Sequence, residues 1–257
     1  MDKDISHILK GWDYKPGQIT VRRIQGDDGM DKIQLRLDLG VLQMETVGRP
    51  DGKRPRGYES LLHYHQYRLD DHIRRNGTEL GFALSAKRSM QLREEGVMYY
   101  HRYLAMFVLE EYEQVVRDTE RNLALAEFCH KYAGDEKDRM ALEQYRPYII
   151  MMNSRAKGNI DLNNNAPKTA LAHLQAGLEN IKSFFSEYGQ EEMASKCNET
   201  VILTAMVDEI QEKLKTDPIE KMRSKLQQLV DGEQYEQAAL LRDQIREMES
   251  NTDNPER

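Results

Sequence analysis

The sequence of 257 residues is long enough for one large domain or two small ones and can bury a hydrophobic core, which excludes a chain that is disordered throughout. Charged residues make up 32% and the apolar set AVILMFWYC only 39%, a balance typical of helices with one apolar stripe and one solvated face. The formal net charge is −7, and residues 1–75 hold 14 Lys and Arg against 12 Asp and Glu, so the charge pattern excludes a global nucleic-acid-binding field.

The cysteines and the apolar runs indicate where the protein resides. Cys129 and Cys197 are far apart and have no CxxC pattern, which predicts neither a disulfide framework nor a zinc site. Residues 1–15 contain no apolar signal core, and the longest apolar runs, 105–109 and 148–152, are too short to span a bilayer. We therefore expect a cytoplasmic protein that does not associate with membranes.

The first predicted elements are two β-strands in residues 1–57, an N-terminal region that also holds a basic loop. Residues 18–25 and 31–39 alternate apolar and polar side chains around the turn sequence GDDG, as a β-hairpin requires. Four apolar residues would share one face of the second strand: Ile33, Leu35, Leu37 and Leu39. The alternation breaks from Gly40, which predicts a bulge, and the Gly- and Pro-rich sequence at 48–57 predicts a loop.

Residues 58–216 are expected to form an α-helical scaffold. Helical periodicity predicts helices over residues 58–75, 86–109, 112–132, 139–157, 166–187 and 190–214. Two helix pairs, one around residues 104–128 and one around 146–181, loosely resemble tetratricopeptide repeats, although Val115 and Asn122 stand where such repeats usually have Ala. Either tetratricopeptide-like stacking or an irregular α-bundle is consistent with these residues.

The sequence of residues 217–250 predicts a second type of helical element, an antiparallel pair of short helices. Apolar residues recur in each helix at intervals of three and four, and we call them the seam: Ile219, Met222, Leu226 and Leu229, then Ala238, Leu241, Ile245 and Met248. The break at 230–233 is so short that the helices must run antiparallel, and small side chains at Ala238 and Ala239 allow them to approach closely. The tail 251–257 is expected to be disordered.

The sequence YEQAALLRDQI at 235–245 resembles the UVR motif of the B and C subunits of the UvrABC excision nuclease. Similar motifs occur in Clp-type AAA+ unfoldases and in the activator of the bacterial protein arginine kinase. The resemblance implies contact with another UVR hairpin or with helices of a partner. The residues expected to bind that partner are Leu226, Leu229, Tyr235, Ala238, Ala239, Leu241, Arg242 and Ile245. Alternatively, the hairpin is only the last helix pair of the chain's own stack.

These features favour a protein-interaction adaptor that is not an enzyme and needs no cofactor, with a protein partner or a second copy bound through the hairpin. A Walker-type loop, a nuclease signature and a Ser/His/Asp or Cys/His grouping are absent from the sequence. His63, His65 and His72 are close in sequence, but the first two would point about 200° apart on a helix, so no metal site is expected.

A second function class is nucleic-acid binding, for example by an accessory protein of DNA repair. Its candidate phosphate-contacting residues form the one basic cluster of the sequence: Arg22, Arg23, Arg49, Lys53, Arg54 and Arg56. A salt-bridged loop or a docking site for an acidic partner are alternative explanations of the same residues.

Aromatic residues gather around Tyr100 and again at Tyr145 and Tyr148. Intervals of three and four place Tyr100, Tyr103 and Phe107 on one face of a helix, which favours packing in the core. The alternative is a peptide-binding groove lined by the remaining aromatic residues.

Overall fold

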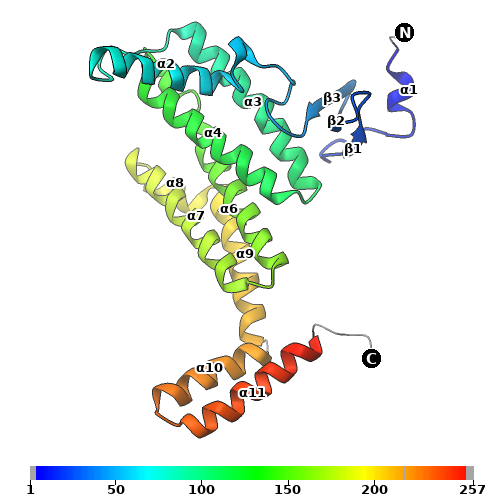
Figure 1. The fold of residues 1–257 in the computed structure, drawn as a ribbon, viewed down its shortest axis with the longest axis vertical. Helices are drawn as coiled ribbons and strands as arrows, with labels where there is room; N and C mark the ends of the chain where they lie inside the picture. Colours follow the sequence, from blue (N-terminus) through cyan, green and yellow to red (C-terminus); the bar gives the residue numbers. More distant parts are fainter. Residues whose placement is uncertain (1–3, 217, 253–257) are drawn as a thin grey trace.

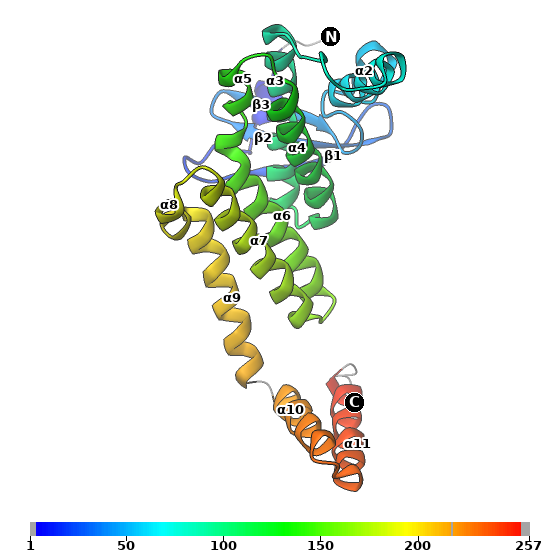
Figure 2. The same ribbon diagram turned by 90° about the vertical axis from the view of Figure 1, so that its left-hand side faces the viewer.

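The computed structural model describes residues 4–216 and 218–252, without the side chains at 219, 220, 224, 247 and 249–252. The chain is mainly helical and elongated, and it carries a small sheet near its N-terminus (Figure 1). This sheet and the last two helices lie at opposite ends of the molecule, as two perpendicular views show (Figures 1 and 2). The predicted fold class, mainly α with an N-terminal β element and a C-terminal helical hairpin, is confirmed.

The N-terminal β element has one more strand than predicted. A helical turn, α1 (Ser6–Leu9), precedes an antiparallel sheet in the order β1-β2-β3, made of β1 (Val21–Gln25), β2 (Asp31–Leu37) and β3 (Gly40–Glu45). The predicted bulge from Gly40 is wrong, because Asp38 and Leu39 form a two-residue turn and the chain returns as β3. Leu37 and Leu39 are therefore 38% and 89% exposed, instead of sharing the buried face of Ile33 and Leu35.

Eight helices follow a 3₁₀ turn at Pro55–Gly57 and precede the terminal pair: α2 (Leu61–Asn76), α3 (Ala86–Val108), α4 (Tyr112–Tyr132), α5 (Glu136–Met140), α6 (Arg146–Asn163), α7 (Pro167–Glu187), α8 (Glu191–Lys196) and α9 (Asn198–Thr216). Two predicted helices are thus divided. The segment 139–157 contains the end of α5 and most of α6, and 190–214 contains α8 and α9 with a break at Cys197.

The long helices pack on one another in chain order, α3 on α4, α4 on α6, α6 on α7 and α7 on α9. One continuous hydrophobic core runs from Ile33 in the sheet to Ile210 in α9. Glycine permits close crossings: a Cβ at Gly177 in α7 would overlap the Ser154 hydroxyl of α6. The resemblance to tetratricopeptide repeats stays a prediction.

A buried ion pair holds α3 to α4. Asp118 accepts from Arg102 at both carboxylate oxygens, with the Nε–Oδ2 distance 2.6 Å and the Nη2–Oδ1 distance 2.8 Å. Both side chains are fully buried, and Arg102 also donates to the Glu45 carbonyl at the end of β3 at 3.0 Å. A bidentate pair satisfies most of the polar atoms it buries, so this contact joins the sheet and two helices at one point.

A second buried acid, Glu95 of α3, holds α2 and the basic loop. Its carboxylate accepts the backbone N–H groups of Leu61 and Leu62 at 2.8 and 3.2 Å, and these N–H groups have no partner within the first turn of α2. The same carboxylate pairs with Arg121 of α4 and, at 3.1 Å, with Arg49 of the loop. Four segments distant in sequence therefore meet at one acidic side chain.

We predict that Asp118→Ala lowers the free energy of unfolding by about 3–5 kcal/mol, because it leaves the Arg102 guanidinium buried without a counter-charge. The control is Asp71→Ala, which breaks ion pairs to the exposed Arg74 and Arg75 and should cost less than about 1 kcal/mol. Urea unfolding followed by circular dichroism measures both. Equal losses for the two variants would contradict a structural role of the buried pair.

Candidate protein-interaction hairpin

The terminal pair consists of α10 (Pro218–Asp231) and α11 (Tyr235–Thr252), which pack side by side in opposite directions. The link at 232–234 closes the end of α10, since the Gly232 and Gln234 N–H groups donate to carbonyls of its last turn at 3.0 and 2.8 Å. Helix α11 extends to Thr252, two residues beyond the predicted end of the hairpin, and the disorder of the tail stays a prediction. Residues 253–257 lie outside the described residues.

The seam forms the hydrophobic interior of the hairpin itself. Ala238 and Ile245 of α11 are buried, and four further seam residues are half-buried: Met222, Leu226, Leu229 and Leu241. Ile219 lies outside the described side chains. Of the residues predicted to bind a partner, Ala238 and Ile245 are therefore already covered by α10, and a partner reaches the half-buried ones only from the edges of the seam.

The hairpin also carries large apolar side chains that are exposed to solvent. Tyr235 is 64% and Leu240 is 68% exposed, and Val230 and Met248 are also exposed. Tyr235 was among the predicted binding residues, whereas Leu240 was not. Leu240 follows the buried Ala238 by two positions, about 200° around the helix, so the seam spacing could not include it. The sequence does indicate a further apolar residue here, because two leucines, Leu240 and Leu241, follow the two alanines.

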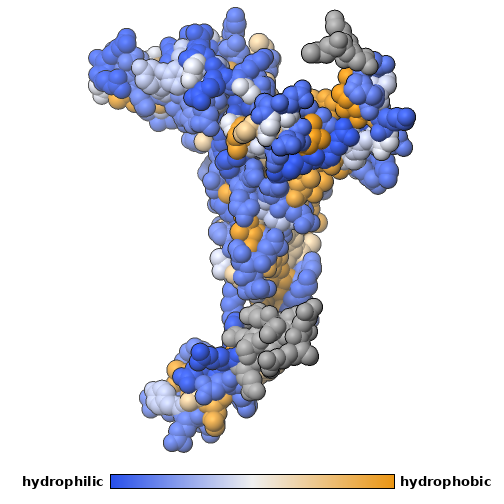
Figure 3. All heavy atoms as spheres, turned by 45° about the vertical axis from the view of Figure 1, so that its right-hand side comes forward, coloured by the Kyte–Doolittle hydropathy of each residue, from blue (hydrophilic) through white to orange (hydrophobic). Residues whose placement is uncertain are grey.

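Two other predicted residues, Ala239 and Arg242, are exposed, and Arg242 pairs with Asp243 at 2.9 Å. The hairpin touches the scaffold mainly through the contact of α10 with α9 and projects away from the stacked helices (Figure 2). Figure 3 shows apolar residues at its surface, and others along the scaffold and near the sheet. The hairpin is therefore not one more layer of the stack.

Most of the predicted phosphate-contacting residues have partners within the chain. Arg22 donates to the Gln34 side chain at 2.8 Å, and Arg23 forms ion pairs with Asp31 and Glu111. Arg49 pairs with Glu95 at 3.1 Å, and the Arg56 guanidinium lies over the Tyr64 ring. Lys53 and Arg54 are exposed. The structure thus uses the basic cluster chiefly to join loop, sheet and helices, and phosphate binding by these residues stays a prediction.

The described residues contain no group of three or more His, Cys, Asp and Glu side chains that could hold a metal ion. His65 is buried, where its pKa falls to about 4 because burial and three nearby arginines disfavour the charged ring, whereas His63 is exposed. In residues 4–216 and 218–252, none of the helices is both long and apolar enough to cross a membrane.

The geometry of α10 and α11 defines a class of element, a small antiparallel helical hairpin that projects from a larger scaffold. Residues 216–251 match the UvrB/uvrC motif, so the chain carries a UVR motif in this hairpin. In UvrB and UvrC, this motif mediates interactions between proteins. Neither a curated protein nor a solved structure matches the chain.

We predict that Ile245→Asp opens the hairpin, because it places a carboxylate in the seam, whereas Leu240→Asp leaves the hairpin folded, because Leu240 already faces solvent. Amide hydrogen exchange measures the difference, with loss of protection throughout α10 and α11 only in Ile245→Asp. Protection in α3 and α4 is the internal control and should not change. Loss of protection in both variants would contradict the assignment of Leu240 to the outer face.

Proposed function

We propose that this protein is an adaptor, not an enzyme, and that it binds a partner protein through the α10–α11 hairpin. The observation that carries the proposal is the exposure of Tyr235 and Leu240 on an element that projects from the scaffold. Apolar side chains on such an element gain free energy when a partner covers them, about 1.5–3 kcal/mol for a leucine that becomes fully buried. The UVR motif supports the same assignment.

The partner surface combines the exposed residues with the edges of the seam. A helix that lies along α11 can cover Tyr235 together with Ala239, which are four residues apart and therefore neighbours on the helix surface. Arg242 extends the same row and adds a charge that favours an acidic group on the partner. The proposed occupant is a helical element, either from a different protein or from the UVR hairpin of a second copy.

We place the adaptor in the cytoplasm. Both cysteines are free thiols, Cys129 buried and Cys197 partly buried, which suits a reducing compartment. Burial raises the pKa of the Cys129 thiol to about 12, so this residue is inert in the folded protein.

The double variant Tyr235→Ala, Leu240→Asp should abolish partner capture, because it removes the exposed apolar surface and leaves the seam intact. The measurement is affinity purification of the tagged full-length chain from its native cell, with quantitative mass spectrometry of what is retained. Leu39→Asp, at a leucine that is even more exposed in the turn between β2 and β3, is the control and should retain the partner. Equal capture by the double variant and the control would overturn the proposal.

Analytical ultracentrifugation distinguishes pairing of the hairpin with a second copy of the chain from binding of a different protein. If the hairpin pairs with itself, the full-length chain sediments as a dimer and removal of residues 217–257 yields a folded monomer, since the scaffold has its own core. A full-length chain that is monomeric at high micromolar concentration assigns the hairpin to a different partner. A dimer that persists after the truncation would exclude pairing through the hairpin.

A further inference from the structure

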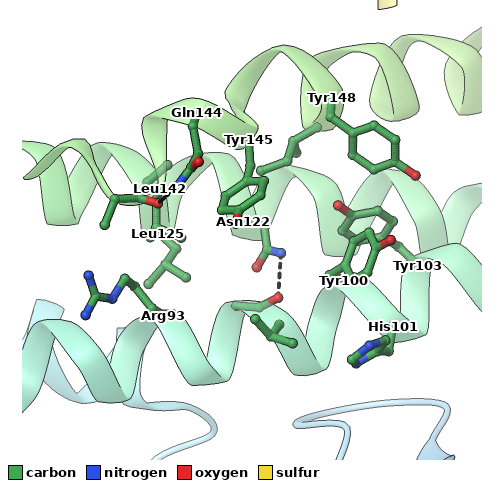
Figure 4. Close-up of a pocket in the computed structure, with 15 residues that line it drawn as sticks. Arg93, Tyr100, His101, Tyr103, Asn122, Leu125, Leu142, Gln144, Tyr145 and Tyr148 are labelled. Atoms are coloured by element: carbon green, nitrogen blue, oxygen red, sulfur yellow. Dashed lines mark hydrogen bonds between the residues drawn. The ribbon is translucent and has the colours of Figure 1, made fainter. Parts of the chain in front are cut away.

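A second concave surface lies in the scaffold, away from the hairpin. A groove of about 600 Å³ separates α3 from the segment that leads from α5 into α6, and α4 forms its floor (Figure 4). Tyr100 of α3 and Tyr145 and Tyr148 at the start of α6 line its walls, and Leu125 and Asn122 of α4 lie at its base. Tyr145 and Tyr148 belong to the aromatic residues of the predicted alternative, whereas Tyr100 was expected in the core, and peptide binding by this cavity stays a prediction.

The walls of the groove are apolar surface that the chain does not cover. Tyr145 is 55% exposed and Val97, on the α3 side, is 51% exposed. The floor is rigid by contrast, since Leu125 is fully buried and the Asn122 amide donates to the Gly96 carbonyl at 2.9 Å (Figure 4). A preformed apolar cleft with few polar groups is the usual form of a ligand site in proteins.

Beyond the residues that line the groove, α3 and α6 continue in the same direction and remain in contact. Tyr100 contacts Tyr148 with ring centroids 6.1 Å apart. Seven residues further along each helix, the Arg155 guanidinium lies 4.5 Å from the centre of the Phe107 ring. Seven residues correspond to about 10.5 Å along a helix, so Arg155 stands about that far from Tyr148, beyond the residues that line the groove.

Arg155 is a partly buried cation without a carboxylate. No Asp or Glu among the described residues lies within 4 Å of its guanidinium, whereas Arg93, which lines the groove, pairs with Asp138 at 3.1 Å. The Nε atom of Arg155 is buried without a hydrogen-bond partner, and Nη1 meets only the Met152 sulfur at 3.9 Å. Burial accordingly lowers the pKa of this guanidinium.

The surroundings of Arg155 do not supply the missing anion. The interactions that raise its pKa come from the phenols of Tyr148 and Tyr112, which are neutral at pH 7. Burial is the main cause that raises the pKa of Tyr148 and of Tyr112, and Glu199 and Glu110 add smaller contributions, yet neither carboxylate pairs with Arg155. Partly buried charges in proteins are normally paired, so the surroundings of Arg155, about 10.5 Å beyond Tyr148, lack a counter-charge.

We propose that the groove binds a short acidic peptide segment of a partner protein, which inserts an apolar side chain between Tyr100, Tyr145 and Tyr148 and places a carboxylate on Arg155. In an extended peptide, about 10.5 Å corresponds to about three residues, so the apolar and acidic side chains stand about three positions apart. This surface is separate from the hairpin, and the proposal does not depend on the function assigned there.

The probe is a library of random octapeptides displayed on phage and selected on the immobilised full-length protein. Enriched peptides should carry an aromatic or long aliphatic residue two to four positions from Asp or Glu. A synthetic, fluorescein-labelled copy of the most enriched peptide then provides the dissociation constant by fluorescence anisotropy. Arg155→Gln should weaken its binding about ten- to one hundred-fold, as expected for the loss of a charge-assisted hydrogen bond.

Matched variants separate the groove from other surfaces. Tyr148→Ala should also lower the affinity for the peptide. Arg74→Gln and Tyr67→Ala, which change exposed residues of the same types on α2, should leave that affinity unchanged. Leu240→Asp in the hairpin should leave the affinity unchanged. Absence of enrichment, enrichment of basic peptides, or equal affinity for Arg155→Gln and Arg74→Gln would each overturn the proposal, as would loss of binding in Leu240→Asp alone.

Discussion

The scaffold depends on the fully buried ion pair between Arg102 and Asp118. Two charges removed from water are tolerated only where their geometry is good, and here two short hydrogen bonds and a third to the Glu45 carbonyl meet that condition. The pair joins α3, α4 and the sheet, and Glu95 joins α2 and the basic loop to the same two helices. The remaining helices stack in chain order on this foundation.

The same α3–α4 pair connects the polar interior with the proposed groove. One side of α3 presents Glu95 and Arg102 to the ion-pair network, and another presents Val97 and Tyr100 to the groove. Because buried ion pairs fix α3 on one side, its opposite side forms a rigid wall of the groove. The groove therefore keeps its shape when nothing is bound. Rigid support of this kind lowers the entropic cost of binding a flexible segment.

The hairpin is stabilised by different interactions from the scaffold. Its interior consists of a few aliphatic side chains around Ala238 and Ile245, without buried ion pairs among its described side chains. So small an element buries little surface of its own, and its outer apolar residues remain available to a partner. Helix α9 spans about 28 Å and carries the hairpin away from the groove, so both surfaces can be occupied at once.

Periodic patterns in the sequence determined the helical class, most helix bounds, the first two strands and the seam of the hairpin, because burial along one face repeats with the period of the element. Tertiary structure decided what periodicity does not encode. The two-residue turn at Asp38 that creates β3, the partners of Arg49 and Arg22, and the solvent-facing side of Leu240 all depend on neighbours in space. The groove likewise required α3 and α6 to be set in parallel, which brings Tyr100 to Tyr148 and leaves Arg155 beside Phe107 without a carboxylate.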